Sequence, residues 1–138
     1  MPQLLLVEPI AYWQNLLKPP LEAIVGTGNI VPSQYLEDAV SKLGREYAAG
    51  IFTIAMARNS GSQIEPRLGL ELAERVSAVW NGYDKIAMVI DDLGMLPEVL
   101  AKGITKVYSK VKPQGEIRRK VRHWVHLSQD LRTAGLLV

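Results

Sequence analysis

Short apolar runs that alternate with amphipathic segments constrain the fold of this chain more than any other feature of its sequence. Consecutive apolar residues suit a strand buried on both faces of a sheet, whereas apolar residues three and four apart suit a helix. The apolar runs cover residues 3–7 (QLLLV), 49–57 (AGIFTIAMA), 85–90 (KIAMVI) and 105–111 (TKVYSKV), with a weaker run over 21–31. The weaker run is either one strand with a bulge at Gly26–Asn29 or two short pieces.

Amphipathic segments between these runs complete a repeating β-α pattern. Helical spacing covers residues 10–17, 33–47, 68–80, 95–102 and 116–131. We expect Lys18-Pro19-Pro20 to end the first helix and Ser33 to cap the second. The sequence therefore predicts an α/β fold: a three-layer sandwich with a five-stranded parallel sheet of order 2-1-3-4-5 and helices on both faces.

Length and composition narrow the class of protein further. The 138 residues suit one domain over residues 1–138. There is no Cys, which excludes disulfides, thiolate catalysis and Cys-ligated metals. No apolar run reaches the length of about 18 residues that a membrane span needs, so we expect a soluble cytoplasmic protein without membrane contacts.

Three segments resemble the receiver domain of bacterial response regulators. LLLVEP (4–9) is similar to the first strand and acidic turn of a receiver, and GLELAERV (69–76) to the segment that opens its third helix. AKGITKVYSKVKP (101–113) is similar to the stretch that carries the fifth strand, an aromatic residue and a Lys-Pro pair. The resemblance extends over residues 3–130 and implies a flavodoxin-like fold and a role in two-component signal transduction.

The residues that receivers use to bind metal and accept phosphate are only partly present. The resemblance places Glu8 at the first of two acidic positions that hold Mg²⁺, but it places Pro9 at the second. A proline side chain has no oxygen to offer a hard cation. The position of the phosphate-accepting Asp falls on Ala57 or Arg58, and neither side chain can form an acyl phosphate.

The two remaining receiver positions complete the comparison. Asp91 falls where a Ser or Thr would contact the phosphoryl group, and Lys112 matches the phosphate-contacting Lys. We expect Glu8, Arg58, Asp91 and Lys112 to form an ion-pair network without a nucleophile. The resemblance then implies a pseudo-receiver: a signalling or interaction module, not an enzyme, that takes no phosphate and needs no Mg²⁺, other metal or cofactor.

A second class of function remains open. Glu8, Asp91 and Asp92, together with Lys112, could serve a small metal-dependent α/β enzyme. Asp92 also suits the N-cap of the following helix, which is the interpretation we favour. His123 and His126 lie three residues apart without further ligands in the sequence, so we interpret them as surface residues.

Charge is distributed unevenly along the chain. Residues 1–99 hold 7 Lys/Arg and 12 Asp/Glu, a net −5, whereas residues 100–138 hold 9 and 2, a net +7. On the predicted last helix Arg118, Arg119 and Arg122 share one face. In receivers the surface formed by the fourth helix, fifth strand and fifth helix is the usual dimer or output surface.

The resemblance therefore implies a protein partner or a homodimer, held through the last strand and helix. Tyr108 and Trp124 would be the aromatic anchors of that surface if they are exposed. A basic surface for nucleic acid is the remaining alternative, although the predicted fold supplies no element that reads a groove.

Overall fold

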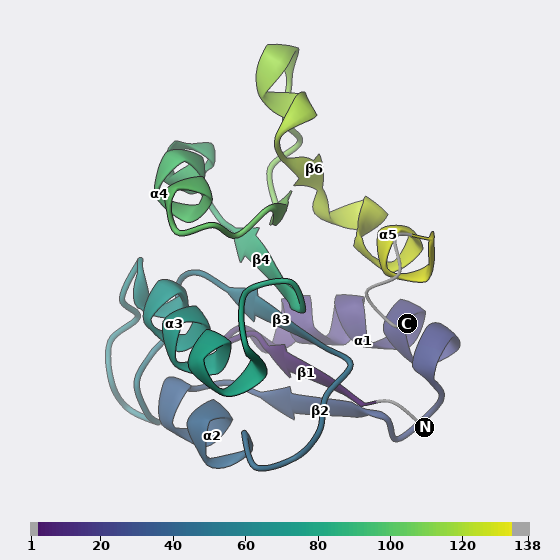
Figure 1. Cartoon of the computed structure of the whole chain (residues 1–138), viewed down its shortest axis with the longest axis vertical. Helices are drawn as coiled ribbons and strands as arrows, with labels where there is room; N and C mark the ends of the chain where they lie inside the picture. Colours follow the sequence, from purple (N-terminus) through teal and green to yellow (C-terminus); the bar gives the residue numbers. More distant parts are fainter. Residues whose placement is uncertain (1–2, 134–138) are drawn as a thin grey trace.

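The computed structural model describes residues 3–133 and contains one parallel sheet with helices on both faces (Figure 1). The strands are β1 (Leu4–Val7), β2 (Ile30–Ser33), β3 (Ala49–Thr53), β4 (Ile86–Ile90), β5 (Lys106–Ser109) and β6 (Arg122–His123). Their order is β2-β1-β3-β4-β5-β6, and every neighbouring pair is parallel. The predicted architecture and the order of the first five strands are confirmed. The prediction of five strands is wrong, because β6 pairs with β5 through Tyr108–Arg122 and Ser109–His123.

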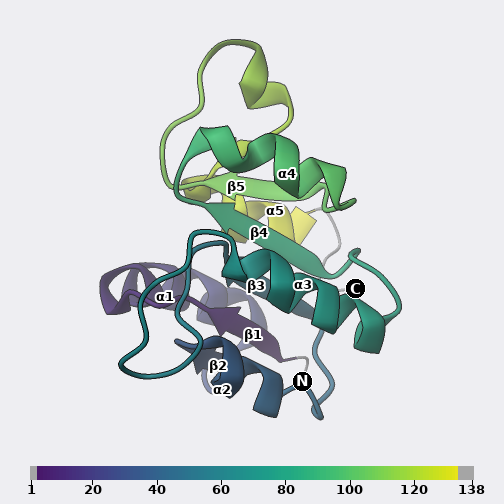
Figure 2. The ribbon, with the colours of Figure 1, turned by 90° about the vertical axis from the view of Figure 1, so that its left-hand side faces the viewer.

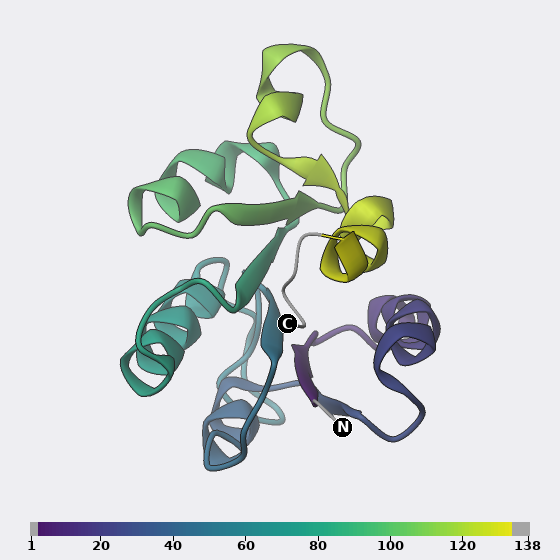
Figure 3. The same ribbon diagram turned by 45° about the vertical axis from the view of Figure 1, so that its right-hand side comes forward.

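Within residues 3–133, five α-helices cover the two faces of this sheet (Figure 3). They are α1 (Ala11–Val25), α2 (Leu36–Ser41), α3 (Leu68–Trp80), α4 (Leu96–Ala101) and α5 (Leu127–Thr133). Helices α1 and α5 lie together on one face, and α2, α3 and α4 lie on the other. Short 3-10 helices span Leu93–Met95, Gly115–Arg119 and Trp124–His126. No helix in the described part of the chain is long and apolar enough to cross a membrane.

The core consists of two apolar clusters, one on each side of the sheet. Because successive side chains of a strand point to opposite faces, β1 contributes to both clusters. Leu5 and Val7 pack with the residues of α2, α3 and α4. Leu4 and Leu6 pack with the residues of α1 and α5. This double burial is the reason that the strands are apolar on consecutive residues.

Helix α1 continues through Pro19-Pro20, where we predicted its end. Leu17, Leu21 and Val25 are buried at intervals of four residues, while both prolines are exposed. A proline inside a helix costs about 3 kcal/mol because it removes a hydrogen bond and crowds the preceding turn. Burial of the apolar stripe offsets this cost. The weak run over 21–31 is therefore the last turns of α1 followed by β2.

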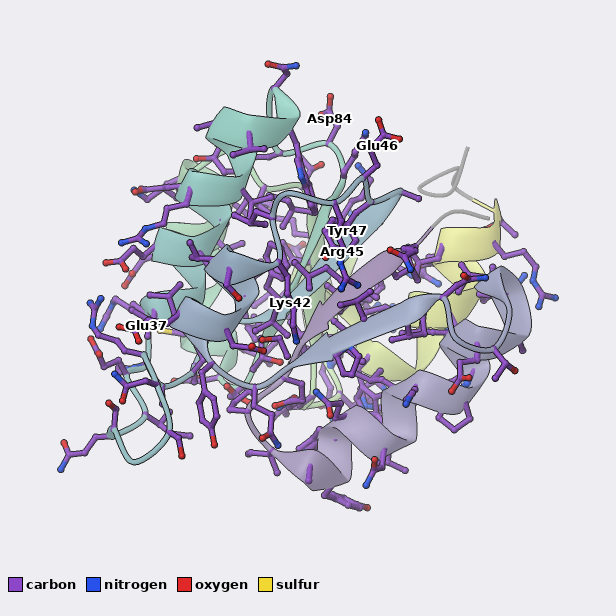
Figure 4. All side chains as sticks on the ribbon, turned by 90° about the horizontal axis from the view of Figure 1, so that it is seen from below. Glu37, Lys42, Arg45, Glu46, Tyr47 and Asp84 are labelled. Carbon is purple, nitrogen blue, oxygen red and sulfur yellow. The ribbon has the colours of Figure 1, made fainter. Side chains whose placement is uncertain are left out.

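Ser33 is the last residue of β2 and does not cap α2, which corrects the predicted N-cap. Its hydroxyl donates to Asp38 Oδ2 at 2.6 Å. Lys42, at the end of α2, reaches back to β2 and donates to Pro32 O at 2.7 Å and to Asp38 Oδ2 at 2.8 Å (Figure 4). These contacts fix α2 to the edge of the sheet.

The predicted helix over 116–131 is wrong: this segment forms two 3-10 helices, β6 and α5. Ile117 and Val121 pack into the cluster beneath α2, α3 and α4. Trp124, Leu127 and Leu131 pack into the cluster beneath α1 and α5. One straight helix cannot reach both faces of the sheet, so the chain passes around the sheet edge, and β6 forms where it crosses.

Candidate functional site

Four polar side chains meet where the strands of the sheet end. Glu8 follows β1, Thr53 ends β3, Asp91 follows β4 and Lys110 follows β5. The register pairs Val7 with Phe52, so the next residues, Glu8 and Thr53, stand side by side. Ligands of open parallel α/β sheets bind outside the carboxyl ends of the strands, which makes this cluster the candidate functional site.

Glu8 is the centre of the cluster and is fully buried, with 0% exposure. Its Oε1 accepts a hydrogen bond from Thr53 Oγ1 at 3.0 Å and lies 2.6 Å from Lys110 Nζ. Its Oε2 accepts a hydrogen bond from the backbone N–H of Ile10 at 3.0 Å. A buried carboxylate is tolerated when it is paired and hydrogen-bonded, and both oxygens of Glu8 meet that condition.

Lys110 supplies the opposing charge, and only 6% of its side chain is exposed. Its ammonium lies 3.1 Å from Asp91 Oδ1 as well as 2.6 Å from Glu8. It also lies 4.8 Å from the centre of the Trp13 ring. Neither carboxylate is at an angle that makes a directed hydrogen bond, so Coulombic attraction and the aromatic face hold the ammonium.

This arrangement leaves little room for chemistry. The lysine ammonium lies within ion-pair distance of both Glu8 and Asp91, where a divalent cation would need to share their oxygens. The hydroxyl of Thr53 is the nearest nucleophile, but it donates to Glu8 and its residue is 2% exposed.

Two of the four residues predicted for the ion-pair network, Glu8 and Asp91, come together, but Arg58 and Lys112 do not join them. Arg58 Nε lies 3.0 Å from Glu65 Oε2, and Arg58 Nη1 lies 3.2 Å from Glu71 Oε2. Lys112 is exposed, and among residues 3–133 no carboxylate lies within ion-pair distance of it. Lys110 occupies the position that we assigned to Lys112.

Ala57 and Arg58, the residues predicted at the phosphate-acceptor position, do not directly follow β3. Strand β3 ends at Thr53, four residues before Ala57, and the buried Met56 and Ala57 beyond it form isolated β-bridges with Glu65 and Tyr35. The carbonyls of Ala57 and Arg58 accept hydrogen bonds from the N–H groups of Leu36 and Glu37 at 3.0 and 2.9 Å. They therefore satisfy the first free donors of α2.

The acidic residue after Asp91 has a local role. Asp92 Oδ1 accepts a hydrogen bond from Gly94 N at 3.0 Å and caps the 3-10 helix over Leu93–Met95, as the N-cap interpretation expected. Pro9, beside Glu8, is half-buried. Within the described residues no group of three His, Asp or Glu side chains is placed to hold a metal ion.

The residues predicted for an interaction surface lie on different elements, although Tyr108, Arg119 and Arg122 line one hollow. Tyr108 is 4% exposed and donates to Asp130 Oδ2 at 2.9 Å, so it is not an exposed anchor. Trp124 is half-buried against Trp13, with ring centres 5.3 Å apart. Because residues 116–131 do not form one helix, the three predicted arginines share no helix face. Arg118 and Arg119 lie on a 3-10 helix, and Arg122 lies on β6.

Thr53 and Lys110 are the site residues that sequence reasoning missed. Thr53 is the one polar side chain in the run AGIFTIAMA, and a hydroxyl inside a buried run indicates a hydrogen-bond partner. Lys110 follows Ser109 directly, whereas Lys112 is already two residues further into the loop. Ending the predicted strands at Thr53 and at Ser109 would have identified both residues.

Comparison with known proteins adds no relative. No family model matches the chain, and no curated protein matches it either. The fold and the strand-tip cluster are therefore the basis for any statement about function.

Proposed function

We propose that this chain is a receiver-like interaction module of the cytoplasm that acts through protein contacts and not through aspartyl phosphorylation. The observation that carries the proposal is the buried Glu8–Lys110 pair, beside a Thr at the end of β3. In a working receiver that strand end would present a carboxylate, and a metal would neutralise the phosphate oxygens. Here a hydroxyl and an internal ammonium stand in their places.

The same cluster gives less support to a metal-dependent enzyme built on Glu8, Asp91 and Asp92. Lys110 already lies within ion-pair distance of the first two carboxylates, and Asp92 accepts a hydrogen bond from Gly94 N. Separating the buried pair to admit a cation would leave a lysine ammonium desolvated without a partner, which is costly. The interaction module requires no such rearrangement.

A groove beside α4 is the contact surface that we assign to this module. Its floor is apolar and its rim carries two cations and one acid, and its volume is about 510 Å³. The lining residues are Leu93, Gly94, Leu96, Pro97, Leu100, Glu116, Ile117, Arg119 and Lys120. Apolar side chains of a partner would fill the floor, and acidic side chains would pair with Arg119 and Lys120. We therefore propose an acidic, amphipathic protein segment as the partner.

Thermal unfolding with Mg²⁺ and beryllofluoride, a mimic of the acyl phosphate, tests the phosphorylation-independent part of the proposal. An inert site predicts that the melting temperature changes by less than about 1 °C. Binding to the native state at saturating ligand would raise it by about 5 °C or more and would refute the proposal.

Site-specific photo-crosslinking tests the contact surface. A photoreactive residue at Leu100, in the groove, should form a protein adduct in cells, and Arg119→Glu should abolish that adduct. The matched control is Arg75→Glu on the exposed side of α3, which should leave the adduct unchanged. Equal loss in both variants would show that general charge, and not the groove, makes the contact.

A further inference from the structure

Residues of β6 and its flanking segments line a basic hollow of about 250 Å³. Figure 2 shows that the segment between β5 and β6 projects beyond the sheet. Its lining residues are Lys112, Pro113, Arg118, Val121, Arg122, His123 and His126. Five of these seven residues carry nitrogen groups that donate hydrogen bonds to anions, and none of the seven is acidic. The strand-tip cluster does not include any of them.

Two of the three Lys and Arg side chains that line this hollow have no ion-pair partner within residues 3–133, as is also true of Lys18, Arg45 and Lys85. Arg58, Arg67 and Lys102 each lie within ion-pair distance of a glutamate. Within residues 3–133, Lys112 and Arg118 have no such carboxylate. Positive charges that converge without partners repel each other, and a bound anion would remove that repulsion.

Arg122 adds a guanidinium to the hollow. Its Nε lies 2.7 Å from Asp130 Oδ2, which in turn accepts the hydroxyl of the buried Tyr108, and the Arg122 side chain is 55% exposed. The aspartate therefore holds the guanidinium near Nε. A guanidinium held in this way is suited to phosphate, because its planar N–H groups match two oxygens at once.

We propose that this hollow binds a small ligand through a phosphate or diphosphate group. The volume is smaller than the roughly 300–1,000 Å³ of pockets that enclose a drug-sized molecule, so the anionic group fits and the remainder of the ligand extends into solvent. Lys112 and Arg118 supply charge from the loop and the 3-10 helix. His123 and His126 supply ring nitrogens from β6 and the 3-10 helix that follows it.

A series of aromatic rings connects this site to the strand-tip cluster and provides a fluorescence signal for ligand binding. The rings of His123 and Trp124 lie 6.0 Å apart, and those of Trp124 and Trp13 lie 5.3 Å apart. Trp13 in turn contacts Lys110. A ligand that contacts His123 should therefore change the fluorescence of Trp124. Trp80 packs on the other face of the sheet.

Fluorescence titration with inorganic pyrophosphate at constant ionic strength tests the proposal. We expect saturable binding that Lys112→Gln and Arg118→Gln each weaken about tenfold, the effect of losing one charge-assisted hydrogen bond. The matched control, Lys120→Gln, removes a neighbouring exposed cation that does not line the hollow and should weaken binding less than about twofold.

Two other probes distinguish the source of the phosphate. Inorganic phosphate should compete with pyrophosphate in the same manner, with the same dependence on Lys112. A short single-stranded oligonucleotide that binds more tightly than pyrophosphate, with equal losses in all three variants, would indicate a diffuse nucleic-acid surface and overturn the proposal. The absence of saturable pyrophosphate binding to the unmodified protein would also overturn it.

Discussion

Lys110 Nζ lies 2.6 Å from Glu8 Oε1, and both side chains are withdrawn from water. The pair joins the ends of β5 and β1, which are separated in the sheet by β3 and β4. Asp91 and Thr53, at the ends of those intervening strands, contact the same two groups. A single ion pair therefore occupies the part of the rim above β1, β3, β4 and β5, where ligands of open parallel α/β sheets usually bind.

Removing either partner of this pair should destabilise the protein strongly. Glu8→Gln and Lys110→Met should each lower the free energy of unfolding by about 3 kcal/mol, because each leaves a buried charge without its partner. The double variant should lose clearly less than the sum of the two single variants. Urea unfolding of all four proteins measures this coupling. Additive losses, within about 0.5 kcal/mol, would contradict a direct interaction.

The close contact between α3 and the end of β3 should not tolerate a larger residue. A Cβ at Gly69 would lie 2.5 Å from Thr53 O and 2.6 Å from Ile54 Cα, both of them backbone atoms. Gly69→Ala should therefore cost about 1–3 kcal/mol despite the better helix propensity of alanine. Gly44→Ala, where nothing lies within 4 Å, is the control and should cost far less. Equal stability of the two variants in urea would show that the helix can shift freely.

Much of the fold was predictable because burial determines it locally. The run LLLV in β1 has to be a strand with two covered faces, and the same reasoning gives β4 and the strand order. The path of the last segment was not predictable, because helical spacing does not reveal that Val121 and Leu127 belong to opposite faces of the sheet. The predicted end of the first helix at Pro19 was wrong for a related reason. The long-range packing of Leu17 and Leu21 outweighs the effect of a local helix breaker.

The location of the site at the strand ends was predictable from the sequence, but not all of its residues were. Glu8 and Asp91 follow the ends of their strands and were correctly placed at one rim. Thr53 was missed because the chain remains apolar and buried for four residues after β3 ends, so burial alone does not mark the strand end. Lys110 was missed because a family spacing was given more weight than its position directly after β5.

The Asp38–Lys42 pair should make a small, pH-dependent contribution to stability. Hydrogen bonds from Lys42 and then Ser33 lower the pKa of Asp38 below its ordinary value of 3.8. The contribution of this carboxylate to stability is fully present at pH values above the pKa of the unfolded state. It is lost as the pH falls through the lowered pKa of the folded state. Asp38→Asn should therefore destabilise the protein at pH 7 but scarcely at about pH 2.

The size of this effect should be modest. Because the side chain of Asp38 is 44% exposed, solvent screens the pair, and the loss at pH 7 should remain below about 1 kcal/mol. Urea unfolding at the two pH values measures it. The same loss at both values would mean that the ionised carboxylate is not responsible.

Tyr108 should ionise later than an ordinary tyrosine. Burial, followed by the hydrogen bond to Asp130 and the charge of that carboxylate, raises its pKa well above the ordinary value of 10. The folded state then holds this proton more tightly than the unfolded state, so its contribution to stability is present below pH 10 and declines as pH rises further.

Ultraviolet titration of tyrosinate in the folded protein measures this shift. Of the five tyrosines, Tyr47 and Tyr108 should titrate late, because burial also raises the pKa of Tyr47, and Tyr108→Phe should remove the later of the two steps. Tyr47→Phe provides the matched control, because it should remove the other raised step and leave that of Tyr108. A latest step that is unchanged in Tyr108→Phe would place the hindered phenol elsewhere.

Incubation with acetyl phosphate and Mg²⁺, followed by intact-mass measurement, tests most directly whether the strand-tip rim is closed to phosphoryl transfer. The buried Glu8–Lys110 pair and the Thr at the end of β3 predict an unchanged mass. A stable species heavier by about 80 Da, one phosphoryl adduct, would contradict that prediction if its site mapped to Glu8, Thr53 or Asp91.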